Sequence, residues 1–395
     1  MISRENIPQH WNYLPLRSIF YERKESNKSL ELDFILSIVK DIGVIPYTEK
    51  GNVGNKSKDD LSQYKVARKD DLVLNKMNAV IGSLGISNYD GLVSPIYLVL
   101  ALIEKQKFNV HYFGYFFQIK QIQEGLAQYA YGIMKIRESI DYIEFKKMKL
   151  PIPPLQEQNK IVEFLDYKLD QIEEFIENKT KFIELLKEQK EAVINQAITK
   201  GIDRSVAYKD SEIEWLGEIP KHWEVKKFKF LARITNGQDQ SLVSDSDGEY
   251  PIFGSGGIFG RSSEYLYDQS SVLLGRKGTI DKPLYVESPF WTVDTMFYTK
   301  IFKNTFPKYF YYLCKTIDFK RYVSGSAIPS MTQTDLHEIK FAVAPYKEQI
   351  EIVEYIENEL NQIDQIIEKT TKEIELIREY KTSLISEAVS GKMEI

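Results

Sequence analysis

Two long stretches of the chain repeat apolar residues alternately four and three positions apart. The first runs from 154 to 197 and the second from 345 to 388, a shift of 191 positions. A 4-3 spacing places apolar residues along one helix face, and its persistence over several heptads is typical of a coiled coil. The pattern predicts two long helices with apolar seams formed by Leu165, Leu169, Ile172, Ile176, Ile183 and Leu186 in the first and Ile356, Leu360, Ile363, Ile367, Ile374 and Ile377 in the second.

Polar residues interrupt both seams at matching heptad positions. Lys190 and Lys381 share one such position, and Lys179 and Thr370 share another. Polar seam residues can restrict the register of a coiled coil at a cost in stability. Alternatively, the lysine stems pack in the seam while the ammonium groups stay in water. The sequence leaves both interpretations open.

The segments outside these helices read as short strands and tight turns. They are rich in aromatic and β-branched residues broken by Gly, Asn and Asp, as in SVLLGRKGTIDKPLYV. The string IPQHW returns as IPKHW, which marks the entry to a second globular half. We expect four regions. Residues 1–150 form the first globular half and residues 151–200 the first helix. Residues 201–340 form a linker and the second globular half, and residues 341–395 form the second helix.

The expected fold is α+β, with two β-rich globular domains that are each followed by a long helix. Gly201 is a suitable end for the first helix. Parallel pairing of the helices is conceivable, but antiparallel packing of consecutive long elements needs the simpler connection. We therefore expect an antiparallel coiled coil with pseudo-two-fold symmetry.

Composition narrows the class of protein. A chain of 395 residues with 43% apolar content is compatible with more than one domain. No apolar run approaches the roughly 18 residues that a transmembrane helix needs, and the N-terminus lacks the apolar core of a signal peptide. We expect a cytoplasmic protein with no membrane contact.

The few cysteine and histidine residues argue against a metal site. The chain has one cysteine, Cys314, and four histidines, so neither an internal disulfide nor a Cys/His metal cluster is expected. Cys314 lies in the aromatic run YFYYLCK, where a buried, inert thiol is the expected state.

Charge is unevenly distributed. The net charge of −5 comes from the helical segments, since residues 1–150 carry 21 basic and 17 acidic side chains whereas residues 341–395 carry 6 and 12. Local field rather than total charge attracts a polyanion, so the globular halves could present a cationic face.

The second half holds a candidate surface for a planar, anionic ligand. Glycines let backbone N–H groups approach phosphates, while basic and hydroxyl side chains can contact phosphates or base edges. The alternative is a glycine-rich hairpin with solvated basic residues. The candidate residues are Gly254, Ser255, Gly256, Arg261, Arg276, Lys277 and Thr279.

The first half has polar candidates between two apolar, strand-like runs. Asn75, Lys76, Asn78 and Ser83 lie in the segment LVLNKMNAVIGSLGI. Asn and Lys suit the reading of purine edges. They are equally common as turn residues, so this pattern also leaves two interpretations open.

The whole chain resembles the specificity subunit of a type I restriction-modification system. The resemblance rests on PPLQEQNKIVEFLD and its copy, on GEIPKHW, YPIFGSGG, LLGRKGTI and FWTVDTMFY, and in the first half on GVIPYTEK and GLVSPIYLVL. These motifs together span nearly the entire sequence, and their combination is more specific than any one of them.

The resemblance implies a DNA-reading role. In that family each globular half is a target recognition domain that reads one part of a split sequence in double-stranded DNA. The paired helices fix the distance between the halves and bind the modification subunits, which we expect to number two. Restriction subunits that cleave and translocate DNA are further implied partners. Because the two halves differ outside the entry and helix motifs, the implied target is asymmetric and gapped.

No catalytic residue is predicted in this chain. The string PIPPLQ does not fit the motif of a DNA amino-methyltransferase, and in GNVGNKS Asn55 stands where a P-loop needs its second glycine. The resemblance implies no cofactor here, with S-adenosylmethionine, ATP and Mg on the partner subunits. Two alternatives are a two-headed coiled-coil scaffold that binds proteins rather than DNA, and a stand-alone nuclease with metal-dependent cleavage, which the sequence disfavours.

Overall fold

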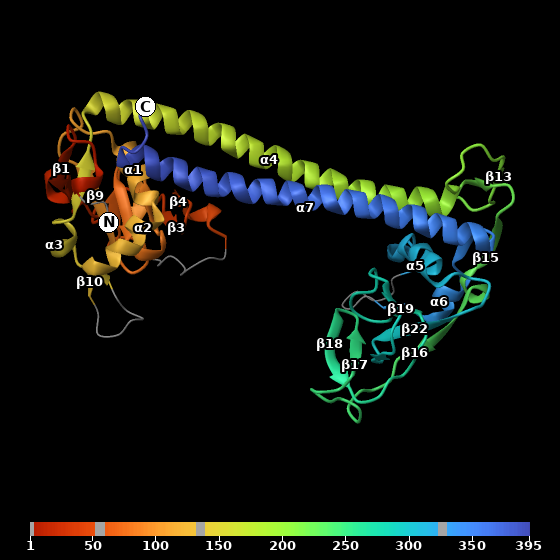
Figure 1. Cartoon of the computed structure of the whole chain (residues 1–395). Helices are drawn as coiled ribbons and strands as arrows, with labels where there is room; N and C mark the ends of the chain where they lie inside the picture. The colour runs from red at the N-terminus through yellow and green to blue at the C-terminus, as the bar shows by residue number, and fades with distance from the viewer. Residues whose placement is uncertain (1–3, 52–59, 132–138, 323–329) are drawn as a thin grey trace. The chain divides into compact units, whose positions relative to one another are not determined.

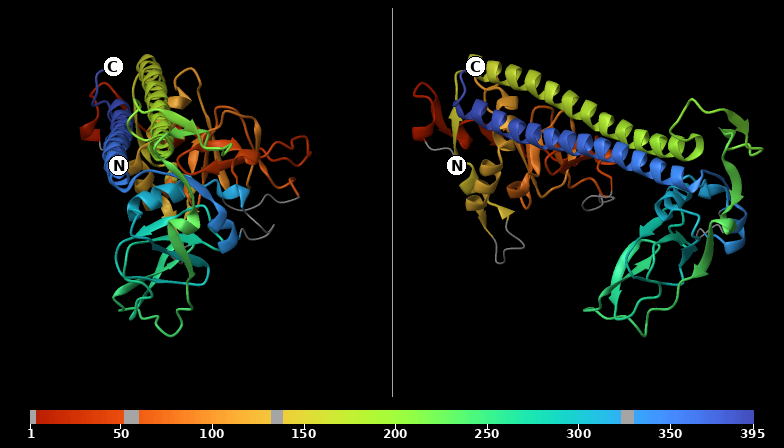
Figure 2. Two further views of the ribbon diagram at one scale, coloured as in Figure 1. Left: turned by 90° about the vertical axis from the view of Figure 1, so that its right-hand side faces the viewer. Right: turned by 45° about the vertical axis from the view of Figure 1, so that its right-hand side comes forward.

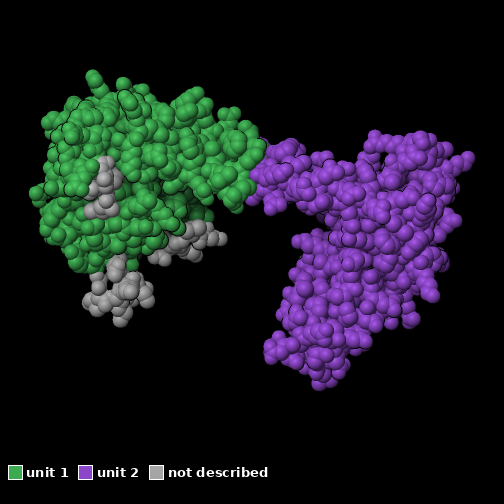
Figure 3. Space-filling view, viewed as in Figure 1, with its two compact units in different colours: residues 1–179, 372–395 green, residues 180–371 purple. Residues whose placement is uncertain are grey.

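The chain divides into two compact units in the computed structural model, which describes residues 4–51, 60–131, 139–322 and 330–395 (Figure 3). Unit 1 comprises Met1–Lys179 and Lys372–Ile395, and unit 2 comprises Thr180–Thr371. Each unit holds one β-rich head and a part of both long helices. We call the part of unit 1 that precedes residue 155 the first head, and residues 201–345 the second head.

The two predicted helices are α4 (Leu155–Lys200) and α7 (Tyr346–Ser390). In unit 1 the first part of α4 lies beside the last part of α7, and in unit 2 the last part of α4 lies beside the first part of α7 (Figures 1 and 2). All the predicted seam residues are buried or half-buried, while most of their neighbours along the helices are exposed. The predicted antiparallel coiled coil is confirmed.

The seam lysines have partly buried stems and ammonium groups that pair with acids on the opposite helix. Their effect on the register stays a prediction. Lys190 Nζ lies 2.6 Å from an oxygen of Asp364, and Lys381 pairs with Glu173. These two ion pairs are copies of each other, because both members are shifted by the same 191 positions.

The centre of the coil departs from this repetition. Lys179 Nζ lies 2.6 Å from a carboxylate oxygen of Glu373. The equivalent of Lys179 is Thr370, which is buried and donates its hydroxyl to the Ile366 carbonyl at 2.8 Å. The pair of helices is therefore symmetric in its apolar seam and asymmetric at its middle.

The heads share one sheet topology. Each contains a four-stranded antiparallel sheet in which the first and last of its strands in the sequence lie side by side. The order in the first head is β2 (Phe20–Glu22), β9 (Tyr97–Leu102), β6 (Leu72–Asn75) and β7 (Leu84–Ile86). The order in the second head is β16 (Ala232–Asn236), β22 (Met296–Ile301), β19 (Ser271–Gly275) and β20 (Leu284–Val286).

Short strands lead into and out of each sheet. A two-stranded pair joins the entry of each head to the strand before the long helix: β1 (Asn12–Pro15) with β12 (Lys149–Ile152), and β15 (Glu224–Lys227) with β23 (Lys340–Val343). The other strands of the first head are β3 (Leu36–Val39), β4 (Gly43–Pro46), β5 (Lys65–Ala67), β8 (Gly91–Val93), β10 (Ala130–Tyr131) and β11 (Ser139–Ile140). Those of the second head are β17 (Tyr250–Gly254), β18 (Gly257–Ser262) and β21 (Trp291–Thr292).

One amphipathic helix covers each four-stranded sheet. In the first head this is α1 (Val110–Gln118), whose Phe113 meets Phe20 edge-on with ring centroids 5.2 Å apart. In the second head it is α5 (Pro307–Lys315), whose Phe310 meets Phe228 at 5.0 Å. The remaining helices are α2 (Lys120–Gly125), α3 (Tyr142–Phe145) and α6 (Gln333–Glu338).

The linker after α4 is itself folded. Gly201, with φ at 75°, ends the helix as predicted. The following residues form a hairpin of β13 (Tyr208–Asp210) and β14 (Glu218–Pro220), and Trp223 follows this hairpin in the sequence. No helix within the described ranges has a stretch long and apolar enough to cross a membrane.

A buried glutamine joins each head to the helix that follows it. Gln158 accepts a hydrogen bond from the Asn109 N–H at 2.8 Å and donates to the Pro153 carbonyl at 2.9 Å. Its copy Gln349 accepts from the Phe306 N–H and donates to the Ala344 carbonyl at the same two distances. Both side chains are almost completely buried, so these amides satisfy backbone groups that water cannot reach.

We predict that Gln158→Ala lowers the free energy of unfolding by about 2–3 kcal/mol, because a buried N–H and a buried carbonyl each lose their partner. Urea denaturation followed by circular dichroism measures this. The matched control is Gln156→Ala, at an exposed position two residues earlier, which should change stability by less than about 0.5 kcal/mol. Equal effects of the two substitutions would contradict the assignment.

Candidate nucleic-acid interface

The two candidate segments found in the sequence lie at the same place in the two heads. The turn that begins at Asn75 follows β6, and the turn that begins after Gly275 follows β19. β6 and β19 are the third strands in sheets of identical order. Asn75 pairs with Tyr97 at the start of β9, and Gly275 pairs with Met296 at the start of β22. Because the two turns lie at the same end of equivalent sheets, they could contact the same kind of ligand.

The turn in the first head uses part of its polar groups to hold its own shape. The Asn75 side chain accepts the Met77 N–H at 3.1 Å, and the Asn75 N–H donates to the Ser83 carbonyl at 3.0 Å. Ser83 is buried. Lys76 is half-buried and Asn78 is exposed, so these two side chains are the ones that remain accessible to a ligand.

In the second head, two turns that are distant in sequence meet. The Ser255 hydroxyl lies 3.0 Å from the point where a Cβ on Gly278 would stand, so the turn between β17 and β18 touches the turn after β19. Gly256 is exposed at the tip of the first turn, whereas Gly254 is buried at the end of β17. The structure thus joins Ser255 and Gly256 to the second group of candidates in one surface.

The second turn presents the basic candidates. The Arg276 guanidinium donates to the Asp294 carbonyl at 3.2 Å, and the Arg276 and Lys277 N–H groups both donate to the Thr295 carbonyl. These bonds fix the backbone of the turn against the start of β22. The Lys277 side chain is exposed, and those of Arg276 and Thr279 are half-buried. A rigid turn with an exposed cation and a hydroxyl is suited to contact with a phosphate backbone.

Arg261 has a different position from the other basic candidates. Its guanidinium donates to the Gly248 carbonyl at 2.6 Å and to the Glu249 carbonyl at 2.9 Å. These contacts hold the loop before β17 against β18. Two of its donors are therefore engaged inside the head, and only the rest can reach a ligand.

A pair of amide side chains that the sequence did not single out lies near the second-head surface. Gln333, the first residue of α6, donates to the Asn236 side-chain oxygen at 2.9 Å, and Asn236 ends β16. The segment before α6 is bonded to the basic turn, since the Met331 N–H donates to the Arg276 carbonyl at 3.0 Å. The two amides are 97 positions apart, so no local pattern marks them as a pair.

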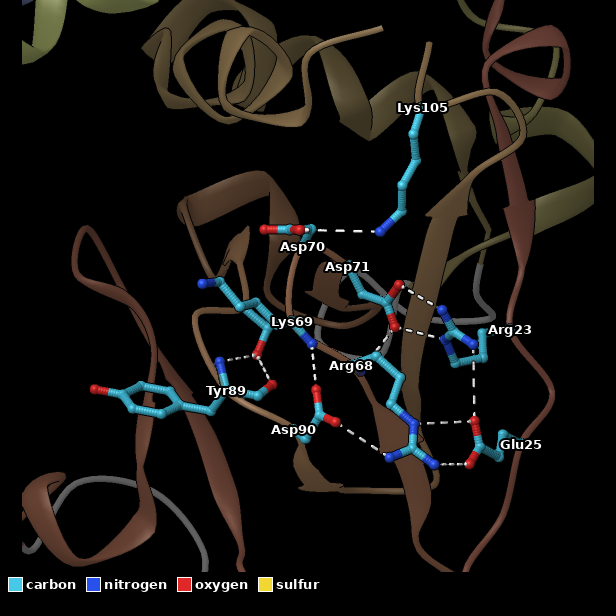
Figure 4. Close-up of polar contacts among 10 residues, drawn as sticks. Arg23, Glu25, Arg68, Lys69, Asp70, Asp71, Tyr89, Asp90 and Lys105 are labelled. Carbon is cyan, nitrogen blue, oxygen red and sulfur yellow. Dashed lines mark hydrogen bonds and ion pairs between the residues drawn. The ribbon is translucent and has the colours of Figure 1, made fainter.

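A cluster of charges in the first head is internally balanced (Figure 4). The Arg23 guanidinium donates to both oxygens of the buried Asp71, at 2.6 and 3.0 Å. Arg68 joins Glu25 and Asp90, and the Lys69 N–H donates to Asp90 at 2.7 Å. The hydrogen bond from Lys69 is the main reason why the pKa of Asp90 is lowered.

This network stabilises three loops of the first head rather than offering charge to a ligand. It ties the segment after β2 to the turns before β6 and after β7. Acidic and basic members are equal in number, so the cluster adds little field at a distance. The charged residues drawn are Arg23, Glu25, Arg68, Lys69, Asp70, Asp71, Asp90 and Lys105.

Possible metal ligands and the single cysteine are among the chemical groups that the sequence raised in connection with catalysis. In the ranges 4–51, 60–131, 139–322 and 330–395 no three His, Cys, Asp or Glu side chains are grouped as metal ligands. Burial raises the pKa of the Cys314 thiol well above its ordinary value, which makes it a poor nucleophile, as predicted. Residues 52–59, with most of the P-loop-like string GNVGNKS, lie outside the described residues.

Comparison with protein families gives a match on both halves. The sequence model of the family described as the type I restriction modification DNA specificity domain matches residues 9–185 and again residues 220–376. Each match covers most of one head and more than half of the long helix that follows it.

Three related proteins match between 45% and 98% of the chain. A protein of Methanocaldococcus jannaschii assigned as the MjaX type I restriction enzyme specificity subunit is 25% identical over 98% of this chain and 95% of its own length. The MjaVIII specificity subunit of the same organism is 26% identical over 65% of this chain and 64% of its own. The EcoDI specificity subunit of Escherichia coli is 22% identical over 45% of this chain and 40% of its own length.

Solved structures share the fold over nearly the whole chain. A chain from a structural study of complex assembly and conformational transition of the type I R-M system has a TM-score of 0.75 at 12% identity, covering 98% of this chain and 99% of that one. The HsdS subunit from Thermoanaerobacter tengcongensis has a TM-score of 0.61 at 13% identity, covering 98% of each. At such identities the likeness is one of fold.

We predict that Asp71→Ala destabilises the first head by about 2–3 kcal/mol, because it removes the two hydrogen bonds that the half-buried Arg23 guanidinium donates to Asp71 and the one from the Arg68 N–H. Asp33→Ala, at an exposed position of the same head, is the control and should have little effect. Urea denaturation measures both. A loss below about 1 kcal/mol for Asp71→Ala would show that the network is not a structural support.

Proposed function

This chain belongs to the type I restriction modification DNA specificity family, and we propose that its two heads read the two halves of a bipartite, gapped DNA target. The observation that carries the proposal is the repeated sheet with an equivalent polar turn after its third strand. The turns occupy the same place but differ in sequence, NKMNAVIGS in one head and RKGT in the other. Two heads with the same sheet topology but different side chains in these turns would recognise two different half-sequences.

The two turns divide the work of recognition in the way expected for protein–DNA contacts. Lys277 and Lys76 supply positive charge to phosphates, while Arg276, Asn78 and the Asn236–Gln333 amide pair supply donors and acceptors for base edges. Ser255, Gly256 and Thr279 offer hydroxyl and backbone groups near the same surface of the second head. Asn75, Ser83, Gly254 and Arg261 shape the turns and loops that carry these groups.

The domain assignment follows from this division. Residues 1–150 and 201–340 form the two target recognition domains, the latter with its linker, and residues 151–200 and 341–395 form the helical regions. The coil sets the distance between the half-sites. It also carries a net negative charge, with 22 acidic and 13 basic side chains in residues 151–200 and 341–395 together, which suits contact with protein rather than DNA.

The chemistry of modification and cleavage belongs to partner subunits. This chain directs modification subunits, two per complex, and restriction subunits to the target. S-adenosylmethionine, ATP and Mg act on those subunits, and this chain contributes specificity alone. The place of action is the cytoplasm, where the DNA is.

DNA binding by the purified chain or its complex with the modification subunits tests this function against a protein-binding scaffold. We expect affinity for duplex DNA that falls steeply as salt rises, because phosphate contacts release counterions. Fluorescence anisotropy with a labelled duplex, repeated at several salt concentrations, measures it. A well-folded complex without DNA affinity would favour the scaffold.

We predict that Arg276→Ala with Lys277→Ala weakens DNA binding by about 10- to 100-fold and reduces the salt slope by about one, since one phosphate contact and one base contact are lost. The control is Lys303→Ala. Lys303 is equally exposed but follows the C-terminal end of β22, at the opposite end of the sheet from the turn. A double variant with parental affinity would remove this turn from the interface.

We predict that one added heptad in each long helix, after Lys179 and after Thr370, lengthens the gap of the target by about three base pairs. Seven residues preserve the 4-3 seam and add about 10 Å of helix. Sequencing of methylated sites in cells that express the variant with its modification subunits gives the gap. The half-sequences should stay unchanged, and an unchanged gap would show that the coil does not set the spacing.

A further inference from the structure

The entry motif of the first head joins that head to both long helices. Trp11 is 1% exposed, and its indole N–H donates to the Glu157 carboxylate at 2.8 Å, in the first turn of α4. The neighbouring His10 ring nitrogen lies 2.9 Å from the other oxygen of Glu157. The opposite side of the same indole faces the end of α7. A Cβ on Gly391, where φ is 72°, would stand 3.0 Å from Trp11 Cη2 and 2.5 Å from Pro8 Cδ.

The second head repeats this junction with the helices exchanged. Trp223 is fully buried, and its indole N–H donates to Glu348 at 3.1 Å, in the first turn of α7. The His222 ring nitrogen lies 2.8 Å from the second oxygen of Glu348. Gly201, directly after the last residue of α4, packs against the same indole, with its Cβ position 3.3 Å from Trp223 Cζ2.

Each tryptophan therefore holds the beginning of one helix and the end of the other. The two contacts can be made together only when α4 and α7 have one particular register. A slide of one helix along the other by one heptad moves it by about 10 Å. Trp11 would then lose its contact with either Gly391 or Glu157. The same slide would open the junction at Trp223.

The seam itself does not exclude such a slide. Its apolar residues recur every seven positions, so a shift of seven brings apolar residues against apolar residues again. Of the three seam lysines described above, Lys190 and Lys381 would also find a new acid in one direction of the slide. Lys190 would meet Glu357 instead of Asp364, and Lys381 would meet Asp166 instead of Glu173.

Those alternative acids are occupied by the heads. Asp166 accepts a hydrogen bond from Tyr115, and Glu357 pairs with Lys308. In the same direction Lys179 would lose its acid outright, because the apolar Ile366 would replace Glu373. In this direction the groups that distinguish the native register from its neighbour are thus mostly contacts between head and helix. A slide in the opposite direction would place Thr371, Thr180 and Tyr380 against the three lysines, so the ion pairs oppose that slide as well.

We propose that Trp11 with Glu157 and Trp223 with Glu348 are register clamps, which hold the two helices at one offset and so fix a single gap length. Trp11, Glu157, Trp223 and Glu348 are positioning residues, since they act on the target through the helices. The consequence for the gap rests on the proposed function. The consequence for the helix register does not.

The design of the test follows from the duplication. One intact clamp is enough to fix the register, so Glu157→Ala or Glu348→Ala alone should keep the parental register. The double variant Glu157→Ala, Glu348→Ala should release it. Glu157→Gln with Glu348→Gln keeps an amide oxygen that accepts the indole N–H and should behave as the parent. The matched control is Glu163→Ala with Glu354→Ala, a pair of equivalent, exposed positions on the same two helices.

Register is measured without DNA by electron–electron distance spectroscopy. Spin labels on Lys160→Cys and Glu379→Cys, both exposed in unit 1 and offset along the coil, report a slide directly. Cys314 is fully buried and so stays unlabelled in the folded chain. We expect one narrow distance in the parent, the single variants, the Gln pair and the control, and a second distance in the double Ala variant. Circular dichroism verifies that each variant is folded.

Methylation mapping gives the functional readout in the complex with the modification subunits. The double Ala variant should methylate targets with a second gap, about three base pairs from the first, while both half-sequences stay the same. A structural role alone would lower the level of methylation at one unchanged gap. One distance and one gap in the double Ala variant would overturn the clamp. A parent that methylates no bipartite target would instead contradict the proposed function, and the spin-label distances would still decide the clamp.

Discussion

The rest of the structure depends on the packing of α4 against α7 along the apolar seam. Burial of one seam residue from each helix at every half-heptad drives the pairing, because neither helix has another apolar face that runs its full length. Each head then joins a place where one helix begins and the other ends. A substitution in the seam would therefore alter the contacts of both heads with the helices. A substitution within one head can leave the packing of the coil unchanged.

The heads show how one fold serves two readings. Their four-stranded sheets have the same order and the same covering helix, and in each head a Phe of that helix, Phe113 or Phe310, packs edge-on against a buried Phe. Their surface turns differ in length and in side chains, and the first head contains the balanced charge network around Asp71. Buried positions preserve the sheet, and exposed turns are free to differ. The family match on both halves agrees with this division.

The sequence predicted the parts of the fold that depend on local periodicity. Both long helices, their seams, the stop at Gly201 and the burial of Cys314 follow from spacing and composition, and the structure confirms them. The common sheet topology was not predictable, since strands of three to six residues carry little periodic signal and the two cores do not repeat in sequence. The repeat of IPQHW was visible, but its partners in the first turn of each helix were not, because no local rule links an indole to a carboxylate 146 positions away.

The candidate site was predicted unevenly for similar reasons. Glycine and basic residues indicated the turns around Ser255 and Arg276, but only folding brings these turns together. Arg261 looks equivalent to Arg276 in the sequence, yet its guanidinium donates two hydrogen bonds to a loop of its own head, whereas that of Arg276 donates one. The Asn236–Gln333 pair forms across 97 positions and left no local signal. The assignment of these residues to DNA contacts stays a prediction.

The central claim is that two different heads, held by one coil, read two half-sequences at a fixed separation. The most direct measurement is to express the chain with its modification subunits in a methylation-free host and to map methylated adenines across the genome by long-read sequencing. The account predicts one motif, made of two unrelated half-sequences around a gap of constant length. A continuous motif, a gap of variable length, or a well-formed complex that methylates nothing would contradict it.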